Sequence, residues 1–160
     1  MSNRRTEGSP TFSAEVGRLL STFDFGSERV RVGIDVVSVS QFEKQSTTKA
    51  GVAFTQSRFT KDELTYCEDR PERLAARWAA KEAIVKAIGS GFRGIRPRDI
   101  EIRHESWGEP TVVCPPGAVW PNDAHLWTWV ISLAHENDAA VAIALAVANQ
   151  CSSRLIQSTE

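Results

Sequence analysis

The chain has 160 residues, with 19 Lys and Arg against 20 Asp and Glu, and therefore a formal net charge of −1. A domain has about 100–200 residues, so this length predicts a single core. The near-neutral charge argues against a protein whose whole surface binds nucleic acid or an anionic membrane. The hydrophobic share of 41% and the charged share of 24% are those of an ordinary globular protein, which excludes disordered and fibrous chains.

Cysteine usage and hydropathy indicate the compartment. The three cysteines are far apart and form no C-x-x-C pair of the kind that binds zinc or exchanges disulfides. The longest apolar stretch, 139–148, is half as long as the roughly 20 residues that span a membrane. The positively charged N-terminus has no apolar run behind it, so we do not expect a secretory signal. We expect a cytoplasmic protein with neither a membrane nor a nucleic acid as its partner.

The ends of the chain are predicted to lie outside the domain. Residues 1–10 are polar, and Ser13 is a suitable N-cap for a short helix because apolar residues follow it at helical spacing. We therefore assign residues 1–29 to a partly flexible extension, 30–148 to the domain and 149–160 to a C-terminal tail.

The domain is predicted to begin with a strand. The run 30–37 is rich in β-branched residues and places an acidic residue, Asp35, among apolar ones. A short helix is expected at 40–44, followed by a Thr- and Gly-rich loop. Thr60 and Glu63 have the spacing of a capping box, which predicts that another helix begins there.

The clearest predicted element is a helix over residues 72–88. Pro71 precedes its first turn and Gly89 follows its last periodic residue. Lys81 lies within the apolar stripe of this helix, and its simplest interpretation is a side chain that extends its ammonium to water. The stripe comprises Leu74, Trp78, Val85 and Ile88.

The second half of the chain reads as strands and turns. After an arginine-rich loop, alternation predicts a hairpin, and two further strands are expected near the end of the domain. These elements are a strand at 99–104, a turn at 107–110, a strand at 111–114, an irregular proline-rich stretch at 115–121, and strands at 126–133 and 139–147.

Several charged residues lie in segments that are expected to be buried, where an unpaired charge costs free energy. Asp35 lies in an apolar strand, and Glu82 and Lys86 lie four residues apart on the long helix. Two carboxylates from separate elements suit Mg²⁺, which takes hard oxygen ligands and leaves room for phosphate oxygens and water. Lys86 and the glycines at 89–91 would then contact the same phosphates. The set predicts phosphoryl-group transfer.

Each feature also has an ordinary structural explanation. Asp35 could be a satisfied strand residue, Glu82 and Lys86 a solvated surface pair, and the glycines a helix stop. His135, between two strands, could be a surface or capping histidine. Their joint occurrence favours the functional interpretation.

Six motifs follow one another from about residue 30 to 147. They are Gly33-Ile34-Asp35, Arg58-Phe59-Thr60 with Glu63, Arg77 to Ala83 with Lys86-Ala87, Gly89-x-Gly91, Asp99 to Ile102 with Gly108-x-Pro110, and Ser132 to Glu136. The W-A-A-K-E-A core with its downstream Lys86 is specific, and the upstream G-I-D supports it. In these motifs the sequence resembles the holo-acyl-carrier-protein synthase family of 4′-phosphopantetheinyl transferases.

This resemblance implies an activity and a fold. The enzyme would transfer 4′-phosphopantetheine from coenzyme A to a serine of an apo carrier protein and release adenosine 3′,5′-bisphosphate. The expected fold is α+β, with an antiparallel sheet packed on a long central helix. A single copy of the motifs resembles the homotrimeric members, in which each site lies between two protomers, and the protomer that supplies His135 stays open.

The resemblance also implies roles for individual residues. Asp35 and Glu82 would hold Mg²⁺ against the pyrophosphate of coenzyme A, and Lys86 would offset charge that develops on it. The general base stays open between a metal-bound water, Glu82 and Asp35. The cofactor contacts that the resemblance implies are at Arg77, Lys81, Lys86, Gly89, Gly91, Ser132 and His135.

Charge is unevenly distributed along the chain. Residues 70–103 hold nine Lys and Arg against four Asp and Glu, a local net charge of +5. An acidic carrier protein and a polyphosphate would both favour such a segment. The alternative is that the arginines at 93, 96 and 98 only keep a loop solvated.

The sequence departs from the family pattern at Gln41, where members commonly have an arginine that resembles a carrier contact, so carrier docking is expected to differ. The stretch Cys114–Leu126 has prolines where relatives usually carry a helix, so the rim of the site is expected to be reshaped. Two rival functions stay open. A catalytically silent module that binds coenzyme A need not keep both carboxylates and Lys86, and a nucleic-acid binder would be expected to interleave aromatic residues with its arginines.

Overall fold

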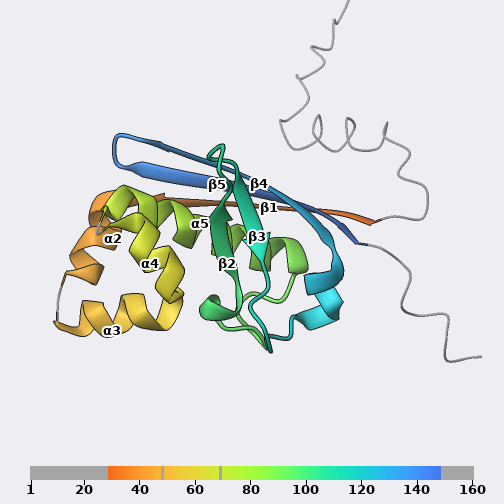
Figure 1. The fold of residues 1–160 in the computed structure, drawn as a ribbon. Coiled ribbons are helices and arrows are strands. Elements are labelled where there is room, and N and C mark those ends of the chain that lie inside the picture. The colour runs from red at the N-terminus through yellow and green to blue at the C-terminus, as the bar shows by residue number, and fades with distance from the viewer. Residues whose placement is uncertain (1–28, 48, 69, 149–160) are drawn as a thin grey trace, which may run out of the picture.

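A computed structural model of the chain describes residues 29–47, 49–68 and 70–148 (Figure 1). The predicted helix after Ser13 and the tail at 149–160 lie outside the described residues. The helices are α2 (Val39–Ser46), α3 (Lys49–Arg58), α4 (Lys61–Cys67) and α5 (Pro71–Ile88), with 3-10 turns η1 (Pro97–Asp99) and η2 (Pro121–Leu126). The strands are β1 (Arg29–Ser38), β2 (Glu101–His104), β3 (Pro110–Val113), β4 (Thr128–Glu136) and β5 (Ala139–Ala148).

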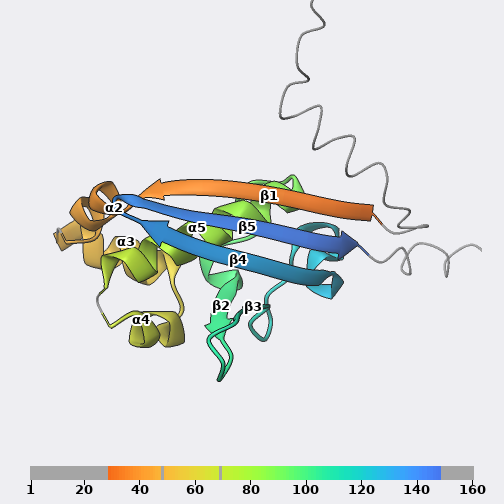
Figure 2. The same cartoon turned by 90° about the horizontal axis from the view of Figure 1, so that it is seen from above.

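The main sheet has three antiparallel strands in the order β1-β5-β4 (Figure 2). Alternate residues of β5 are alanines that face α5 and are fully buried, whereas Ile143 and Leu145 between them are partly exposed on the outer face. Asp35 on β1 and Leu133 on β4 both pair with Ala142, so they share one row across the inner face.

Helix α5 packs along the inner face of this sheet, and twelve of its 18 residues are buried. Pro71 occupies its first turn, and Gly89 ends it in the left-handed conformation at φ 85°. Gly33 on β1 allows the close approach, because a Cβ at that position would lie 1.9 Å from the carbonyl oxygen of Ala83. The prediction of a sheet packed on a long central helix is confirmed.

Helices α2, α3 and α4 pack at one end of α5 and form a second part of the core (Figure 1). The sequence predicted a loop where α3 stands, and this prediction was wrong. The segment contains Gly51, Thr55 and Ser57, which are poor helix formers, and it has no clear apolar stripe, so its local signal is weak. Tertiary packing supports the helix instead: Phe54 meets Phe42 edge to face, with ring centroids 5.8 Å apart.

The β2-β3 hairpin lies beside α5, next to strand β4 at the edge of the main sheet (Figure 2). The stretch predicted to be irregular, 115–121, ends where the 3-10 turn η2 begins, directly after buried Trp120. The Trp120 indole donates to the carbonyl oxygen of Asp99 at 2.7 Å and so ties this stretch to the start of β2. Strand β4 begins two residues later than predicted and continues to Glu136.

Among the described residues, no helix combines the length and the apolar character that crossing a bilayer requires.

Candidate active site

The inner face of β1 and the neighbouring side of α5 bring together two of the predicted residues. The side chain of Asp35 is only 10% exposed, and its Oδ1 accepts a hydrogen bond of 2.7 Å from the Lys86 ammonium. Lys86 also donates to the carbonyl oxygen of Ile34 at 3.1 Å. The Lys86 side chain is 53% exposed. The pair therefore stands at the rim of the β1-α5 contact, where a cation meets solvent.

Glu82 stands one turn before Lys86 on the same side of α5 and is half-buried. Burial raises the pKa of the Glu82 carboxyl, and the nearby carboxylate of Asp35 raises it further. The positive charges of Lys86 and Arg58 lower the pKa of Glu82 and so oppose these two effects. Two carboxylates that repel each other across a strand-helix contact favour a cation between them.

The donor set fits a hard divalent cation that shares its ligands with a substrate. Among the residues that the structure describes, no cluster of three or more His, Cys, Asp and Glu side chains could hold a metal by protein ligands alone. Mg²⁺ is commonly held by one or two carboxylates together with phosphate oxygens and water. Asp35 and Glu82 meet that requirement, and a zinc-type site with four protein ligands does not fit.

Gly89 and Gly91 follow at the end of α5, one turn beyond Lys86. Both have positive φ, at 85° and 56°, and a Cβ built on either meets no neighbour within 4 Å. Their backbone is therefore open on the outside. Both glycines follow Lys86 within five residues, and their contact with phosphates stays a prediction.

The two predicted residues of β4 differ in where they lie. Ser132 is exposed and alternates with buried Ile131, so it belongs to the outer face of the sheet, opposite Asp35. His135 is exposed near the turn to β5 and pairs with Ala140. Within one chain, the structure brings neither side chain to the Asp35–Lys86 pair.

Lys81 departs most from its prediction. Its side chain is fully buried, and its ammonium donates to Glu63 Oε2 at 2.7 Å and to the carbonyl oxygens of Arg58 and Pro97 at 2.7 and 3.0 Å. Burial lowers the pKa of Lys81, and the Glu63 carboxylate opposes that effect. All three donors are used inside the protein. This geometry corrects both the expected extension to water and the prediction that Lys81 binds the cofactor.

Arg77 also lies in the core, on the side of α5 that faces β2. Its exposed fraction is 2%, one Nη lies 2.8 Å from His104 Nδ1, and the guanidinium carbon lies 4.4 Å from the centre of the Tyr66 ring. Burial lowers the pKa of His104, and the charges of Arg77 and Arg73 lower it further. Within one chain Arg77 lies apart from Asp35, and its contact with a nucleotide stays a prediction.

Sequence reasoning assigned no role to Arg58, whose charge acts on Glu82. Its guanidinium carbon lies 3.6 Å from the centre of the Phe54 ring and 5.2 Å from that of Trp78. The only sequence signal was its place in the R-F-T motif. Because the helix α3 that carries Arg58 was not predicted, its position beside α5 could not be inferred.

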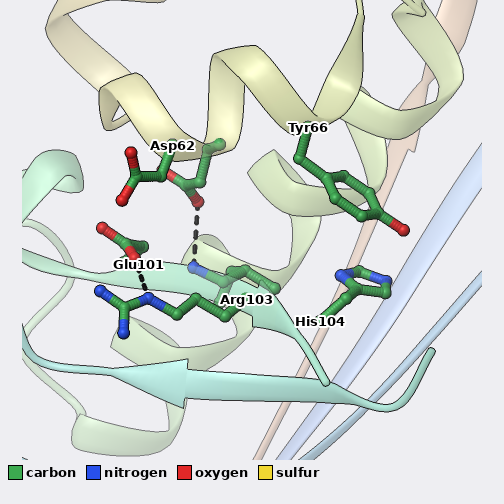
Figure 3. Close-up of a pocket in the computed structure, with 7 residues that line it drawn as sticks. Asp62, Tyr66, Glu101, Arg103 and His104 are labelled. Carbon is green, nitrogen blue, oxygen red and sulfur yellow. Dashed lines mark hydrogen bonds and ion pairs between the residues drawn. The ribbon is translucent and has the colours of Figure 1, made fainter. Parts of the chain in front are cut away.

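A cavity of about 210 Å³ lies between α4 and β2 (Figure 3). Tyr66 and His104 stack at one end of it, with ring centroids 4.6 Å apart, and Glu101 pairs with Arg103 at the other. None of the predicted site residues lines it. Its lining consists of Asp62, Glu63, Tyr66, Glu101, Ile102, Arg103 and His104.

Comparison with known sequences identifies the family. Residues 31–145 match the family model of the 4′-phosphopantetheinyl transferase superfamily. The chain is 38% identical over 117 residues to a holo-[acyl-carrier-protein] synthase of Gloeobacter violaceus, a match that covers 70% of this chain and 88% of that protein.

Solved structures agree with the sequence comparison. The holo-[acyl-carrier-protein] synthase of Neisseria meningitidis is 32% identical and superposes with a TM-score of 0.64, over 72% of this chain and 96% of that one. A Bacillus anthracis synthase in complex with CoA (3′,5′-ADP) is 25% identical with a TM-score of 0.60, over 74% and 96% of the two chains. The chain belongs to the 4′-phosphopantetheinyl transferase superfamily, and the relatives that it resembles are holo-[acyl-carrier-protein] synthases.

Proposed function

We propose that this chain transfers 4′-phosphopantetheine from coenzyme A to a serine hydroxyl of an apo carrier protein and releases adenosine 3′,5′-bisphosphate. The observation that carries the proposal is the gathering of Asp35, Glu82 and Lys86 at the β1-α5 contact, inside the region that matches the family model. These are the charges that a phosphoryl transfer needs, since such a reaction depends on positioning and charge neutralisation more than on covalent help from the protein.

Asp35 and Glu82 would hold Mg²⁺, because they supply two hard oxygen ligands and leave the remaining positions to phosphate oxygens and water. When bound, Mg²⁺ offsets negative charge on the pyrophosphate and thereby favours cleavage of the bond to the leaving group. The mutual repulsion of the two carboxylates, which raises the pKa of Glu82, supports this assignment.

Lys86 would stabilise the leaving adenosine bisphosphate as a point charge. It reaches Asp35 from a half-exposed position, so its ammonium can contact a phosphate without leaving the site. The open backbone at Gly89 and Gly91 would lie along the phosphates beside it. The serine proton would pass to Asp35, to Glu82 or to a bound water.

The outer face of the main sheet supports the proposal that the enzyme is a homotrimer. No described element covers this face in Figure 2. It carries apolar side chains from all three strands, more than a single chain usually exposes together. The apolar side chains are Val32 (49% exposed), Ile34 (54%), Val36 (62%), Val130 (60%), Ile143 (45%) and Leu145 (36%). In a trimer they would be buried against other copies, and Ser132 and His135 could then serve a neighbouring site.

The carboxylates are tested by substitution. Asp35→Ala and Glu82→Ala should each abolish mass-spectrometric transfer of phosphopantetheine from coenzyme A to an apo carrier in the presence of Mg²⁺. Glu109→Ala, which removes an exposed carboxylate beside the β2-β3 hairpin, should leave transfer unchanged. Full activity in either site variant would show that the metal assignment is wrong.

A further inference from the structure

A buried ion pair lies directly behind the candidate active site. Lys81 and Glu63 are joined at 2.7 Å, and both side chains are completely buried. Glu63 Oε2 also accepts from the backbone N–H of Thr60 at 2.8 Å, and Oε1 accepts from that of Ile102 at 3.1 Å, the bond drawn between α4 and β2 in Figure 3. With the carbonyls that Lys81 binds, the pair connects α5 to the end of α3, the start of α4, η1 and β2.

Stability alone does not explain such a pair. Moving two charges out of water costs several kcal/mol per ion, and replacing a buried pair with apolar side chains of similar volume is often neutral or stabilising. Breaking the pair by removing one partner is costly, because the other charge stays buried. The pair instead positions the backbone, because each charged side chain forms hydrogen bonds to particular backbone groups.

One of those backbone groups belongs to Arg58. Lys81 binds the Arg58 carbonyl at 2.7 Å, and the Arg58 side chain runs past Phe54 to Trp78. Trp78 stands one turn before Glu82 on α5, so the guanidinium lies beside the face of the helix that carries Glu82. Among the described residues, Arg58 has no carboxylate within ion-pair distance.

The guanidinium of Arg58 makes only some of the hydrogen bonds that its donors could form. One Nη donates to the carbonyl oxygen of Phe54 at 3.3 Å and to the hydroxyl of Ser57 at 3.1 Å. Its Nε is buried and has no hydrogen-bond partner in the structure. A side chain with so few bonds of its own depends on its backbone for its position.

We propose that Lys81 and Glu63 form a positioning pair, which fixes the backbone of Arg58 and thereby holds the Arg58 guanidinium next to Glu82. The proposal deepens the proposed function, on which it rests. Lys81 contacts neither substrate nor metal. Arg58 is the residue through which the pair acts, as a second cation on the opposite side of Glu82 from Lys86.

The test removes the whole pair, so that no lone charge is left buried. In Lys81→Met/Glu63→Met, thermal unfolding should show a folded protein. Two readouts are then taken: the rate of transfer, and the Arg58 Nε–H signal in a ¹H–¹⁵N spectrum, assigned by its loss in Arg58→Met. We expect the Nε–H signal to lose its protection from exchange and kcat to fall by about 10- to 100-fold.

A double-mutant cycle separates positioning from general destabilisation. Arg58→Met alone should lower kcat by a similar factor, and adding it to the pair variant should cause no further loss. Arg73→Gln is the matched control, because it breaks the Arg73–Glu68 ion pair between α4 and α5 without touching Arg58. This control should keep both the Nε–H signal and kcat.

Unchanged Nε–H protection in the folded pair variant would overturn the proposal. The proposal would also be overturned if the losses in kcat from Arg58→Met and from the pair variant multiplied when the two were combined. If the pair variant does not fold, the same readouts on Glu63→Gln decide, and an unchanged signal again overturns it. The Nε–H readout needs no transfer activity. A loss of protection in a protein that transfers nothing would therefore contradict the proposed function and leave the link from Lys81 to Arg58 in place.

Discussion

At the scale of single residues, the charged side chains of this chain serve two different purposes that the sequence does not distinguish. Lys81 and Lys86 both stand on α5, five residues apart, and both pair with a carboxylate at 2.7 Å. The Lys81 pair has no exposed surface, whereas the Lys86 side chain is half exposed. Burial therefore separates a lysine that organises the interior from one that is accessible to the proposed substrate.

Removing the exposed lysine should affect catalysis far more than stability. Lys86→Ala should lower kcat by about 10²–10³-fold, because the developing charge on the phosphates loses a fixed cation. The free energy of unfolding should change by only about 1–2 kcal/mol, because Lys86 is half exposed, although the largely buried Asp35 carboxylate loses a hydrogen bond. Steady-state kinetics and urea unfolding measure the two effects. A variant that keeps its kcat would contradict the assigned role.

Much of the site could be predicted from the sequence, and the exceptions have physical causes. Asp35, Glu82 and Lys86 were predicted because charge in apolar patterns is costly and therefore informative. The burial of Lys81 could not be predicted, because its partner Glu63 is 18 residues away and appeared to be accounted for as a helix cap. Glu63 in fact serves both purposes with one oxygen, because Oε2 accepts from the Thr60 N–H and from Lys81, while Oε1 accepts from the Ile102 N–H.

At the scale of elements, the contact between β1 and α5 positions the candidate site. Gly33 lets α5 approach until backbone meets backbone at Ala83, and Asp35 follows two residues later on the same face. The fold of α5 and the sheet was predictable from periodicity and caps. Helix α3 was not, because its stability comes from aromatic contacts made by Phe54 and not from its own helix propensity.

Closing this contact requires glycine. Gly33→Ala should destabilise the protein by about 1–3 kcal/mol or more, because the added Cβ would lie 1.9 Å from the Ala83 carbonyl oxygen and must push α5 away. Transfer should fall as well, since Asp35 and Lys86 separate. Glu109→Ala, at an exposed position outside this contact, is the control. Equal unfolding midpoints for the two variants would refute the argument.

The contact between α4 and β2 should respond to pH. His104 has a folded pKa below its ordinary value of 6.5, because burial and the charge of Arg77 disfavour the imidazolium. The unfolded chain therefore binds more protons than the native one. The contribution of His104 to the free energy of unfolding is present above pH 6.5 and is lost as the pH falls through the folded pKa. His104→Asn should flatten this decline in urea unfolding. An unchanged slope would exclude His104 as its source.

At the scale of the whole molecule, the chain has a covered face and an uncovered one. The inner face of the sheet packs on α5, while the outer face presents a continuous apolar surface from β1, β5 and β4 (Figure 2). Sequence alternation predicts both faces but not what covers the second. The proposed trimer accounts for the apolar surface and for the separation of His135 from Asp35 within one chain.

A charge placed on the uncovered face should separate the subunits. Ile34→Glu should convert a trimer into monomers by light scattering, with unchanged secondary structure by circular dichroism, because the buried carboxylate would have no partner. Transfer should be lost with it if the site is shared. Val52→Glu introduces the same charge at an equally exposed apolar position on α3 and should leave the trimer intact. A wild-type protein that is monomeric and active would contradict the shared site.

The central claim is that the Asp35, Glu82 and Lys86 cluster serves phosphopantetheine transfer. Its most direct test is the intact mass of an apo carrier protein after incubation with this enzyme, coenzyme A and Mg²⁺. The account predicts that at least one carrier of a panel from fatty-acid, polyketide and peptide synthases gains the mass of one phosphopantetheine group. The same carrier with its acceptor serine changed to alanine should gain nothing. No mass gain on any carrier, from an enzyme shown to be folded, would contradict the account.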